Sequence, residues 1–364
     1  MHCRGSFPPF DHPVFMHRKL PSMELVSFLK PIAYFFFTAC FLTHLAQKIF
    51  FEYTATMQQQ KNALVILGAT ATGKTALAVA CAKKFSGEII SADSRQVYRE
   101  LTIGSGKDLT EYTGVAYHLI DICDLHTEYN VFNFQRDCVT AFDKIVRKKK
   151  LPIIAGGTGL YLNSILQQYA LLEVPVDPAL RSTLETKPLE ELEAILKSLN
   201  PKLHNTTDLE DRQRAIRAIE IAQFKIAHAQ KTDDRQTEAP TPITPLVFKI
   251  TFDRSVLRKR IRNRLETRLD EGLIDEVRNC VQQYGEQRIL KLGLEYKYTT
   301  LFLKGEYTYK EYVEKLFTAI CQFAKRQETW FHKMEREGVA MIPLDGTDKE
   351  QMLRTIEKYK NTEL

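Results

Sequence analysis

Residues 68–75, GATATGKT, have the spacing G-x-x-x-x-G-K-[ST] of a loop that binds a phosphate chain. Its glycines allow backbone amides to turn toward a phosphate, and a helix that follows adds the partial positive charge of its N-terminus. Lys74 supplies a full positive charge, and the Thr75 hydroxyl can ligate Mg²⁺. The expected phosphate-binding residues are Gly68, Ala69, Thr70, Ala71, Thr72, Gly73, Lys74 and Thr75. The motif predicts a phosphate site and leaves the reaction open.

Two further segments follow apolar runs and can supply the chemistry. Asp93 lies in SADSRQVY, residues 91–98, directly after an expected strand. At the carboxyl edge of a parallel sheet, a carboxylate can ligate Mg²⁺ through water or accept a proton, but Asp93 and Ser94 can equally well only cap a helix. Residues 156–161, GGTGLY, follow another expected strand and either allow close approach of a ligand or form a plain turn.

Basic residues gather in two stretches that suit phosphate groups or a solvated helix face. The first lies in DRQRAIRA, residues 211–218, and the second covers residues 254–268. A third segment, AKRQETWF at residues 324–331, contains the only tryptophan. Aromatic residues beside cations can stack on bases, but at this helical spacing packing in the core is favoured.

The elements that must position these residues are strands alternating with helices. Strands are expected at residues 63–67, 88–92, 117–122, 151–155 and 246–252, and helices at 76–85, 132–150, 189–198, 211–229, 254–284 and 309–337. This order predicts an α/β fold, a P-loop NTPase-like parallel sheet flanked by helices, with an α-helical insertion domain. The expected division is an extension at 1–57, the P-loop core at 58–162, the insertion at 163–235, and the return to the core with C-terminal helices at 236–364.

Composition limits the class of protein. The chain has 364 residues, 44% of them hydrophobic and 26% charged, which excludes a disordered chain and a polytopic membrane protein. The net charge of +6 is compatible with a polyanionic partner. Seven cysteines without a CxxC pair indicate reduced thiols in the cytoplasm.

The first residues stand apart from this pattern. Residues 32–46 are apolar but fewer than the roughly 20 that span a bilayer. A dispensable extension with translation from Met57, a membrane anchor and a cleaved targeting peptide remain open, and the first is favoured.

Taken together, the motifs resemble one family, the tRNA dimethylallyltransferases, also called tRNA isopentenyltransferases. The resemblance runs from Asn62 to Asp345 and rests on GATATGKT, SADSRQVY, IGSGKD, AGGTGLY, DRQRAIRA and AKRQETWF in this order. GLEYKY at residues 293–298 looks like a variant found in one bacterial branch. Ala69 stands where the family usually has proline, and Cys321 and Gln322 stand where many members have two basic residues.

The resemblance implies transfer of a dimethylallyl group from dimethylallyl diphosphate to the exocyclic amine of adenosine 37. This adenosine lies 3′ of the anticodon in tRNAs that read codons beginning with U, and the product is i6A. Asp93 and Thr75 would be the catalytic residues, with Mg²⁺ on Thr75, and Arg254 would bind the pyrophosphate. The residues expected to contact tRNA are Asp93, Ser94, Arg95, Gln96, Thr158, Arg181, Gln213, Arg214, Ala215, Ile216 and Arg217.

The expected partners are the tRNA anticodon stem-loop, gripped by the insertion, and dimethylallyl diphosphate. No stable protein partner is implied, and the chain is expected to act as a cytoplasmic monomer. Three other functions remain open: a P-loop kinase for a small molecule, a prenyltransferase acting on a free adenine nucleotide, and an RNA-binding module without prenyl transfer.

Overall fold

The computed structural model describes residues 60–169, 171–199, 211–228 and 241–364. The predicted extension at 1–57 and its apolar run lie outside these residues, and so does most of the predicted loop at 231–245. In the described part of the chain, no helix is both long enough and apolar enough to cross a membrane.

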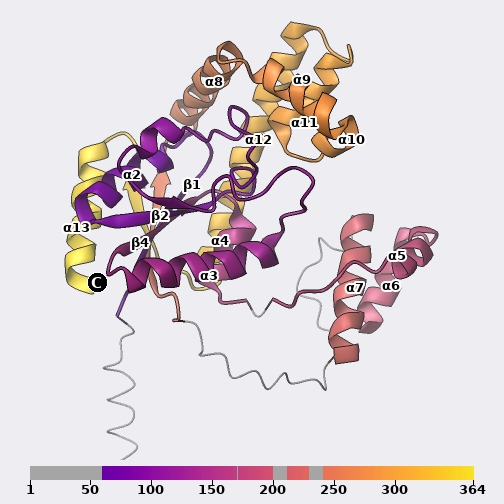
Figure 1. Cartoon of the computed structure of the whole chain (residues 1–364), viewed down its shortest axis with the longest axis horizontal. Helices are drawn as coiled ribbons and strands as arrows, with labels where there is room; N and C mark the ends of the chain where they lie inside the picture. Colours follow the sequence, from indigo (N-terminus) through magenta and orange to yellow (C-terminus); the bar gives the residue numbers. More distant parts are fainter. Residues whose placement is uncertain (1–59, 170, 200–210, 229–240) are drawn as a thin grey trace, which may run out of the picture. The chain divides into compact units, whose positions relative to one another are not determined.

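The described core is built on a parallel sheet, which confirms the predicted α/β fold (Figure 1). The strands lie in the order β3-β2-β4-β1-β5-β6. Their bounds are β1 Ala63–Gly68, β2 Gly87–Ala92, β3 Tyr117–His118, β4 Leu151–Gly156, β5 Pro245–Thr251 and β6 Met341–Asp345. Because β1 pairs with both β4 and β5, the phosphate-binding loop leaves the sheet from its middle.

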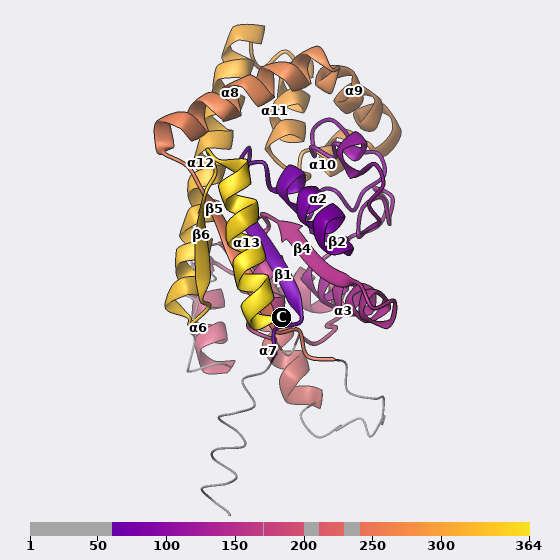
Figure 2. The same cartoon turned by 90° about the vertical axis from the view of Figure 1, so that its left-hand side faces the viewer.

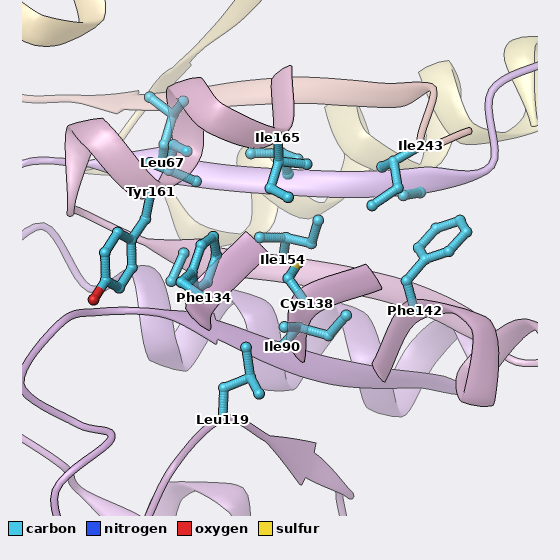
Figure 3. Close-up of a cluster of buried hydrophobic side chains, with 14 of the residues drawn as sticks. Leu67, Ile90, Leu119, Phe134, Cys138, Phe142, Ile154, Tyr161, Ile165 and Ile243 are labelled. Carbon is cyan, nitrogen blue, oxygen red and sulfur yellow. The ribbon is translucent and has the colours of Figure 1, made fainter. Parts of the chain in front are cut away.

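Helices cover both faces of this sheet because β1 is apolar on both sides. Val65 and Leu67 pack on the face covered by α3 Val131–Arg147 and α4 Gly159–Leu166, where Phe134 and Cys138 join them (Figure 3). Leu64 and Ile66 pack on the opposite face, beneath α2 Lys74–Phe85 and α13 Lys349–Glu363. Figure 2 shows α13 lying along this face.

The segment between the two halves of the sheet forms its own helical cluster. It contains α5 Pro178–Glu185, α6 Leu189–Leu199 and α7 Arg212–His228. Their apolar side chains form a separate core of Leu184, Leu192, Leu196, Ala215, Ile216 and Ile219. The expected boundary between residues 162 and 163 falls within α4, whose Leu162 and Ile165 belong to the core of the sheet.

The chain after β5 is helical and packs on a third core. Its helices are α8 Arg254–Asp270, α9 Leu273–Tyr284, α10 Glu286–Ile289, α11 Leu294–Leu303 and α12 Tyr309–Arg336. Ile261, Leu265, Val277, Tyr296 and Leu316 are among the side chains that these helices bury together. Neither β6 nor α13 was expected from the sequence.

Two predicted elements are wrong. The expected strand at 117–122 ends at His118, because Leu119 and Asp121 adopt left-handed backbone angles (φ of 62° and 56°) that break the extended run. The expected single helix at 254–284 is broken at Gly272, whose φ of 99° no right-handed helix allows, so α8 and α9 are separate.

Candidate active site

The phosphate-binding loop joins β1 to α2, as its motif predicts. Lys74 is the first residue of α2, and no side chain caps this helix among the described residues. The first amides of α2 therefore remain available for an anion. Within the loop, the Thr72 hydroxyl donates a hydrogen bond to the Ala69 carbonyl at 2.8 Å. The Lys74 ammonium donates to the same carbonyl, also at 2.8 Å.

A side chain from the far end of the sequence holds this loop against a second one. Gln327, on α12, is buried and accepts a hydrogen bond from the Thr70 amide at 2.8 Å. Its amide nitrogen donates to the Gly157 carbonyl, also at 2.8 Å. One side chain thus links the phosphate loop to the GGTGLY turn after β4, a role that the motif AKRQETWF gave no way to predict.

The turn after β4 must be glycine for this link to form. A Cβ atom at Gly157 would lie 2.5 Å from Gln327 Nε2 and 3.5 Å from Lys74 Nζ. Gly159, two residues after Gly157, lies against Trp330 of α12. Trp330 also packs against the core of the sheet, as expected from the sequence. The glycines of GGTGLY therefore serve the approach of α12 to the site.

Positive charge is concentrated around the loop. Burial and, after it, the charge of Arg264 lower the pKa of Lys74 to about 8, while Asp93 and Glu328 oppose the shift. Burial also lowers the pKa of Arg264 to about 10, with Arg268 as the next cause. Crowded cations with depressed pKa values are stabilised by a bound anion, because the anion supplies the missing opposite charge.

The arginines that contact the loop come from the middle of α8. Arg264 Nη1 donates to the Thr70 hydroxyl at 3.1 Å, and Arg260 Nε donates to the Ala71 carbonyl at 2.8 Å. Arg254, which the resemblance suggested for the pyrophosphate, is exposed at the first position of α8. The structure therefore identifies Arg260 and Arg264, four residues apart on one helix face, as the loop contacts.

Asp93 lies at the carboxyl end of β2, close enough to Lys74 to affect its pKa. Its Oδ1 atom accepts a hydrogen bond from the Arg95 amide at 2.9 Å, so the local turn expected of a cap is also present. Beside it, the Ser94 amide donates to the Thr158 hydroxyl at 3.1 Å, which joins the loops after β2 and β4. Asp93, Ser94 and Thr158 thus lie at one edge of the sheet.

The other two residues of the SADSRQVY prediction have different surroundings. Gln96 is buried, accepts a hydrogen bond from the Ser91 hydroxyl and donates one to the Gly106 carbonyl. Arg95 lies against Gly293 of the GLEYKY segment. Gln96 therefore supports the neighbouring IGSGKD loop from inside the protein.

Thr75 has a partner that the sequence did not reveal. Its side chain lies close enough to the hydroxyl of Tyr112, at the end of the short 3₁₀ turn Leu109–Tyr112, to lower the pKa of that tyrosine. Burial raises the pKa of this tyrosine to about 12, and nearby Glu111, Asp93 and Asp108 contribute to the rise. Tyr112 therefore stays protonated and can orient the Thr75 hydroxyl.

The remaining predicted residues belong to the helical cluster α5–α7. Arg181 and Arg217 both form ion pairs with the buried carboxylate of Glu220, at 2.8 Å and 3.0 Å. Ala215 and Ile216 are buried in the core of this cluster. Gln213 and Arg214 are exposed, so they are the members of the 213–217 segment that present their side chains to solvent.

Comparison with known proteins decides the family. A family model described as IPP transferase matches residues 96–334, and one described as isopentenyl transferase matches residues 61–117. The chain belongs to the IPP transferase family. The family and transferase class predicted from the motifs are confirmed.

Relatives of this family are similar over most of their length. The tRNA dimethylallyltransferase 2 of Treponema denticola is 50% identical over 286 residues, which cover 78% of this chain and 96% of the relative. The tRNA dimethylallyltransferase of Treponema pallidum is 51% identical over 298 residues, covering 80% and 94% of the two chains.

Solved structures of the family share the fold. A tRNA isopentenylpyrophosphate transferase from Bacillus halodurans aligns with a TM-score of 0.59 at 30% identity, over 83% of this chain and 98% of that one. A eukaryotic dimethylallyltransferase described as acting on tRNA aligns with a TM-score of 0.67 at 24% identity, over 83% and 80%.

The Gln327 link yields a direct prediction about the phosphate loop. Gln327→Met keeps the volume but leaves the Thr70 amide and the Gly157 carbonyl without their partner, at a cost of about 1–3 kcal/mol each. We expect a lower midpoint of thermal unfolding and affinity for inorganic pyrophosphate, measured by calorimetry, that is about tenfold weaker.

The matched control is Gln322→Met, an exposed glutamine on the same helix, which should leave both quantities unchanged. Pyrophosphate affinity equal to wild type in Gln327→Met would show that the loop holds its shape without α12.

Proposed function

We propose that the chain transfers a dimethylallyl group from dimethylallyl diphosphate to the exocyclic amine of adenosine 37 in tRNAs that read codons beginning with U. The observation that carries this proposal is the pairing of a phosphate-binding loop with the Asp93 carboxylate at one sheet edge. Relatives named tRNA dimethylallyltransferase, about half identical to this chain, support it.

The cations around the loop suit the departure of a diphosphate. When the allylic C–O bond breaks, its electron pair stays on the phosphate oxygen and a delocalised allyl cation remains. Lys74, the loop amides and Arg264 lie where this negative charge develops, in partly buried surroundings that strengthen their effect. We propose Arg264, with Arg260 beside it, in the pyrophosphate role that the resemblance gave to Arg254.

Asp93 provides what the acceptor needs. The exocyclic amine of adenine is a poor nucleophile because its lone pair is conjugated with the ring. A carboxylate that takes the amine proton as the C–N bond forms raises the rate, and Asp93 is near enough to the phosphate loop to do so. The base must also leave the anticodon stack, and Ser94 and Thr158 line the edge it would enter.

Mg²⁺ fits the donor set, although no group of three His, Cys, Asp or Glu side chains that could hold a metal occurs among the described residues. Mg²⁺ commonly binds through one or two protein oxygens and substrate phosphates. The Thr75 hydroxyl is such a donor, and its neighbour Tyr112 has Asp93, Asp108 and Glu111 close enough to affect its pKa. Bound there, Mg²⁺ would neutralise charge on the diphosphate.

The helical cluster favours tRNA over a small acceptor. A small-molecule kinase normally has a short lid, and a prenyltransferase for free adenine nucleotide needs no grip on tRNA. In this chain, α5–α7 form a cluster with its own core and exposed Gln213 and Arg214. We propose that the chain works as a cytoplasmic monomer without a stable protein partner. The unpaired thiols of Cys81, Cys123, Cys138, Cys280 and Cys321 support a reducing compartment.

Asp93→Asn separates proton transfer from capping. Asparagine keeps the size and the hydrogen bond from the Arg95 amide but cannot take a proton. We expect the rate constant for prenyl transfer, measured in a single turnover with prebound tRNA, to fall about 10²–10⁴-fold. Thermal stability and tRNA affinity should stay close to wild type.

Asp348→Asn, at the cap of α13, controls for the general effect of this exchange and should remain fully active. A loss smaller than about tenfold in Asp93→Asn would assign Asp93 an orienting role only.

Arg214→Ala tests the tRNA contact. Each phosphate contact contributes about one unit to the slope of the logarithm of tRNA affinity against the logarithm of salt concentration. We expect Arg214→Ala to reduce this slope by about one without changing stability. Arg217→Ala, which removes one partner of the buried Glu220, should instead lower thermal stability.

The matched control is Arg354→Ala, an exposed arginine on α13. If Arg214→Ala and this control leave the same slope, the exposed face of α7 does not touch tRNA phosphates.

A further inference from the structure

Arg268 is a buried cation next to the phosphate loop, and the proposed reaction gives it no role. It lies one turn after Arg264 on α8 and is only 7% exposed. Its Nη1 atom donates a hydrogen bond to the Gly104 carbonyl at 3.3 Å. Its Nη2 atom is buried and has no hydrogen-bond partner among the described residues. A buried N–H group of a charged side chain is costly to leave unpaired.

The guanidinium groups of Arg268 and Arg264 converge on one point. A Cβ atom at Gly106 would lie 2.0 Å from Arg268 Nη2 and 2.1 Å from Arg264 Nη2. Gly106 therefore leaves the space in which the two nitrogen atoms meet above the IGSGKD loop. Such convergence of like charges raises the energy of the free protein, and it is one cause of the lowered pKa of Arg264.

A small cavity lies between the same two arginines and the phosphate loop. Thr70, Arg264, Arg268 and Glu295 are among the residues that line it. Its volume of about 10 Å³ is close to what one water molecule requires. It can therefore hold a single oxygen atom of a phosphate group and is too small for a whole diphosphate.

The nearby acidic side chains do not supply a hydrogen-bond acceptor for Arg268 Nη2. Asp108, Glu295 and Asp93 act on Arg264 from a distance, and none of them accepts a hydrogen bond from Arg268 Nη2. An anionic oxygen placed between the two arginines would satisfy the free N–H group and the charge of the pair. Paired guanidinium groups are well suited to phosphate oxygens.

We propose that Arg268 donates from Nη2 to an oxygen of the diphosphate, forming with Arg264 a paired-arginine clamp that binds the leaving group. The clamp rests on the proposed function only in that its diphosphate is that of the prenyl donor. When the C–O bond breaks, the oxygen atom that keeps the electron pair gains negative charge. The clamp therefore binds free pyrophosphate more tightly than the prenyl ester, which lowers the barrier to cleavage.

The test is calorimetric binding of inorganic pyrophosphate, with Mg²⁺ and without tRNA, to the full chain. We expect Arg268→Gln to bind pyrophosphate about 10- to 100-fold more weakly than wild type, as loss of a charge-assisted hydrogen bond predicts. Arg262→Gln is the matched control on the same helix. Its side chain pairs with Glu314 and lies over the Phe317 ring, so pyrophosphate affinity should not change.

A second variant covers the case in which Arg268→Gln does not fold. Arg268→Lys keeps the charge and the stem and can still donate to the Gly104 carbonyl, but it lacks the second nitrogen. We expect thermal stability close to wild type with pyrophosphate affinity reduced by about 5- to 20-fold. The two effects together distinguish a ligand contact from a purely structural one.

Three results would overturn the proposal. Pyrophosphate affinity equal to wild type in Arg268→Lys would mean that a buried water occupies the cavity. In a separate tRNA-binding measurement on Arg268→Lys, weaker binding of tRNA with unchanged pyrophosphate affinity would assign the cavity to an RNA phosphate. If Arg262→Gln weakens pyrophosphate binding as much as Arg268→Gln does, the effect comes from the overall positive charge of α8 and not from a contact of Arg268. Because the assay contains neither a prenyl donor nor tRNA, a failure of prenyl transfer itself would not alter its outcome.

Discussion

The arrangement of the site depends on the two hydrogen bonds that Gln327 makes to the loops after β1 and β4. Thr70 and Gln327 are 257 residues apart in sequence, yet a 2.8 Å hydrogen bond joins them. A parallel sheet brings the carboxyl ends of its strands to one edge but does not fix the loops that leave them. Gln327 fixes them, and α12 can approach closely because residue 157 has no side chain.

This fixed geometry crowds cations that form no direct ion pair with any carboxylate among the described residues. Lys74 lies on α2, whereas Arg264 and Arg268 lie one turn apart on α8, so the packing of the two helices keeps these charges from moving apart. The depressed pKa values of Lys74 and Arg264 reflect the resulting burial and repulsion. A bound diphosphate offsets this repulsion. Pyrophosphate, which carries more negative charge than the prenyl ester, offsets it most, so the same repulsion that destabilises the free protein favours C–O cleavage. In the proposed reaction, Asp93 at the carboxyl end of β2 would then receive the proton of the acceptor.

The sequence predicts best what is local. The phosphate loop and the strands at β1, β2, β4 and β5 depend on short runs of residues, and the structure confirms them. The expected strand at 117–122 is wrong because turns at Leu119 and Asp121 are set by tertiary hydrogen bonds, such as that from the Asp121 amide to the Gln96 carbonyl. The run of basic residues on α8 could not show which arginines face the loop, since this depends on how the helix packs. The resemblance points to Arg254, whereas Arg260 and Arg264 are the residues of α8 that hydrogen-bond the loop.

Long-range pairing hides the remaining roles. Arg181 and Glu220 lie 39 residues apart, and no spacing rule connects them. The resemblance therefore places Arg181 near tRNA but does not reveal its ion pair with Glu220. Tyr112 lies near Thr75, and Gln327 hydrogen-bonds Thr70 and Gly157, again over long distances in the sequence. The spacing of the residues does not reveal these contacts either.

The most direct measurement is the transfer of label from radiolabelled dimethylallyl diphosphate in the presence of Mg²⁺, with unmodified tRNA, AMP and ATP offered as competing substrates. We predict that label appears in tRNA alone, on the adenosine next to the anticodon, and that ATP is not turned over. Label in AMP would identify a prenyltransferase for free nucleotide, and hydrolysis of ATP without any transfer of label would contradict the account as a whole.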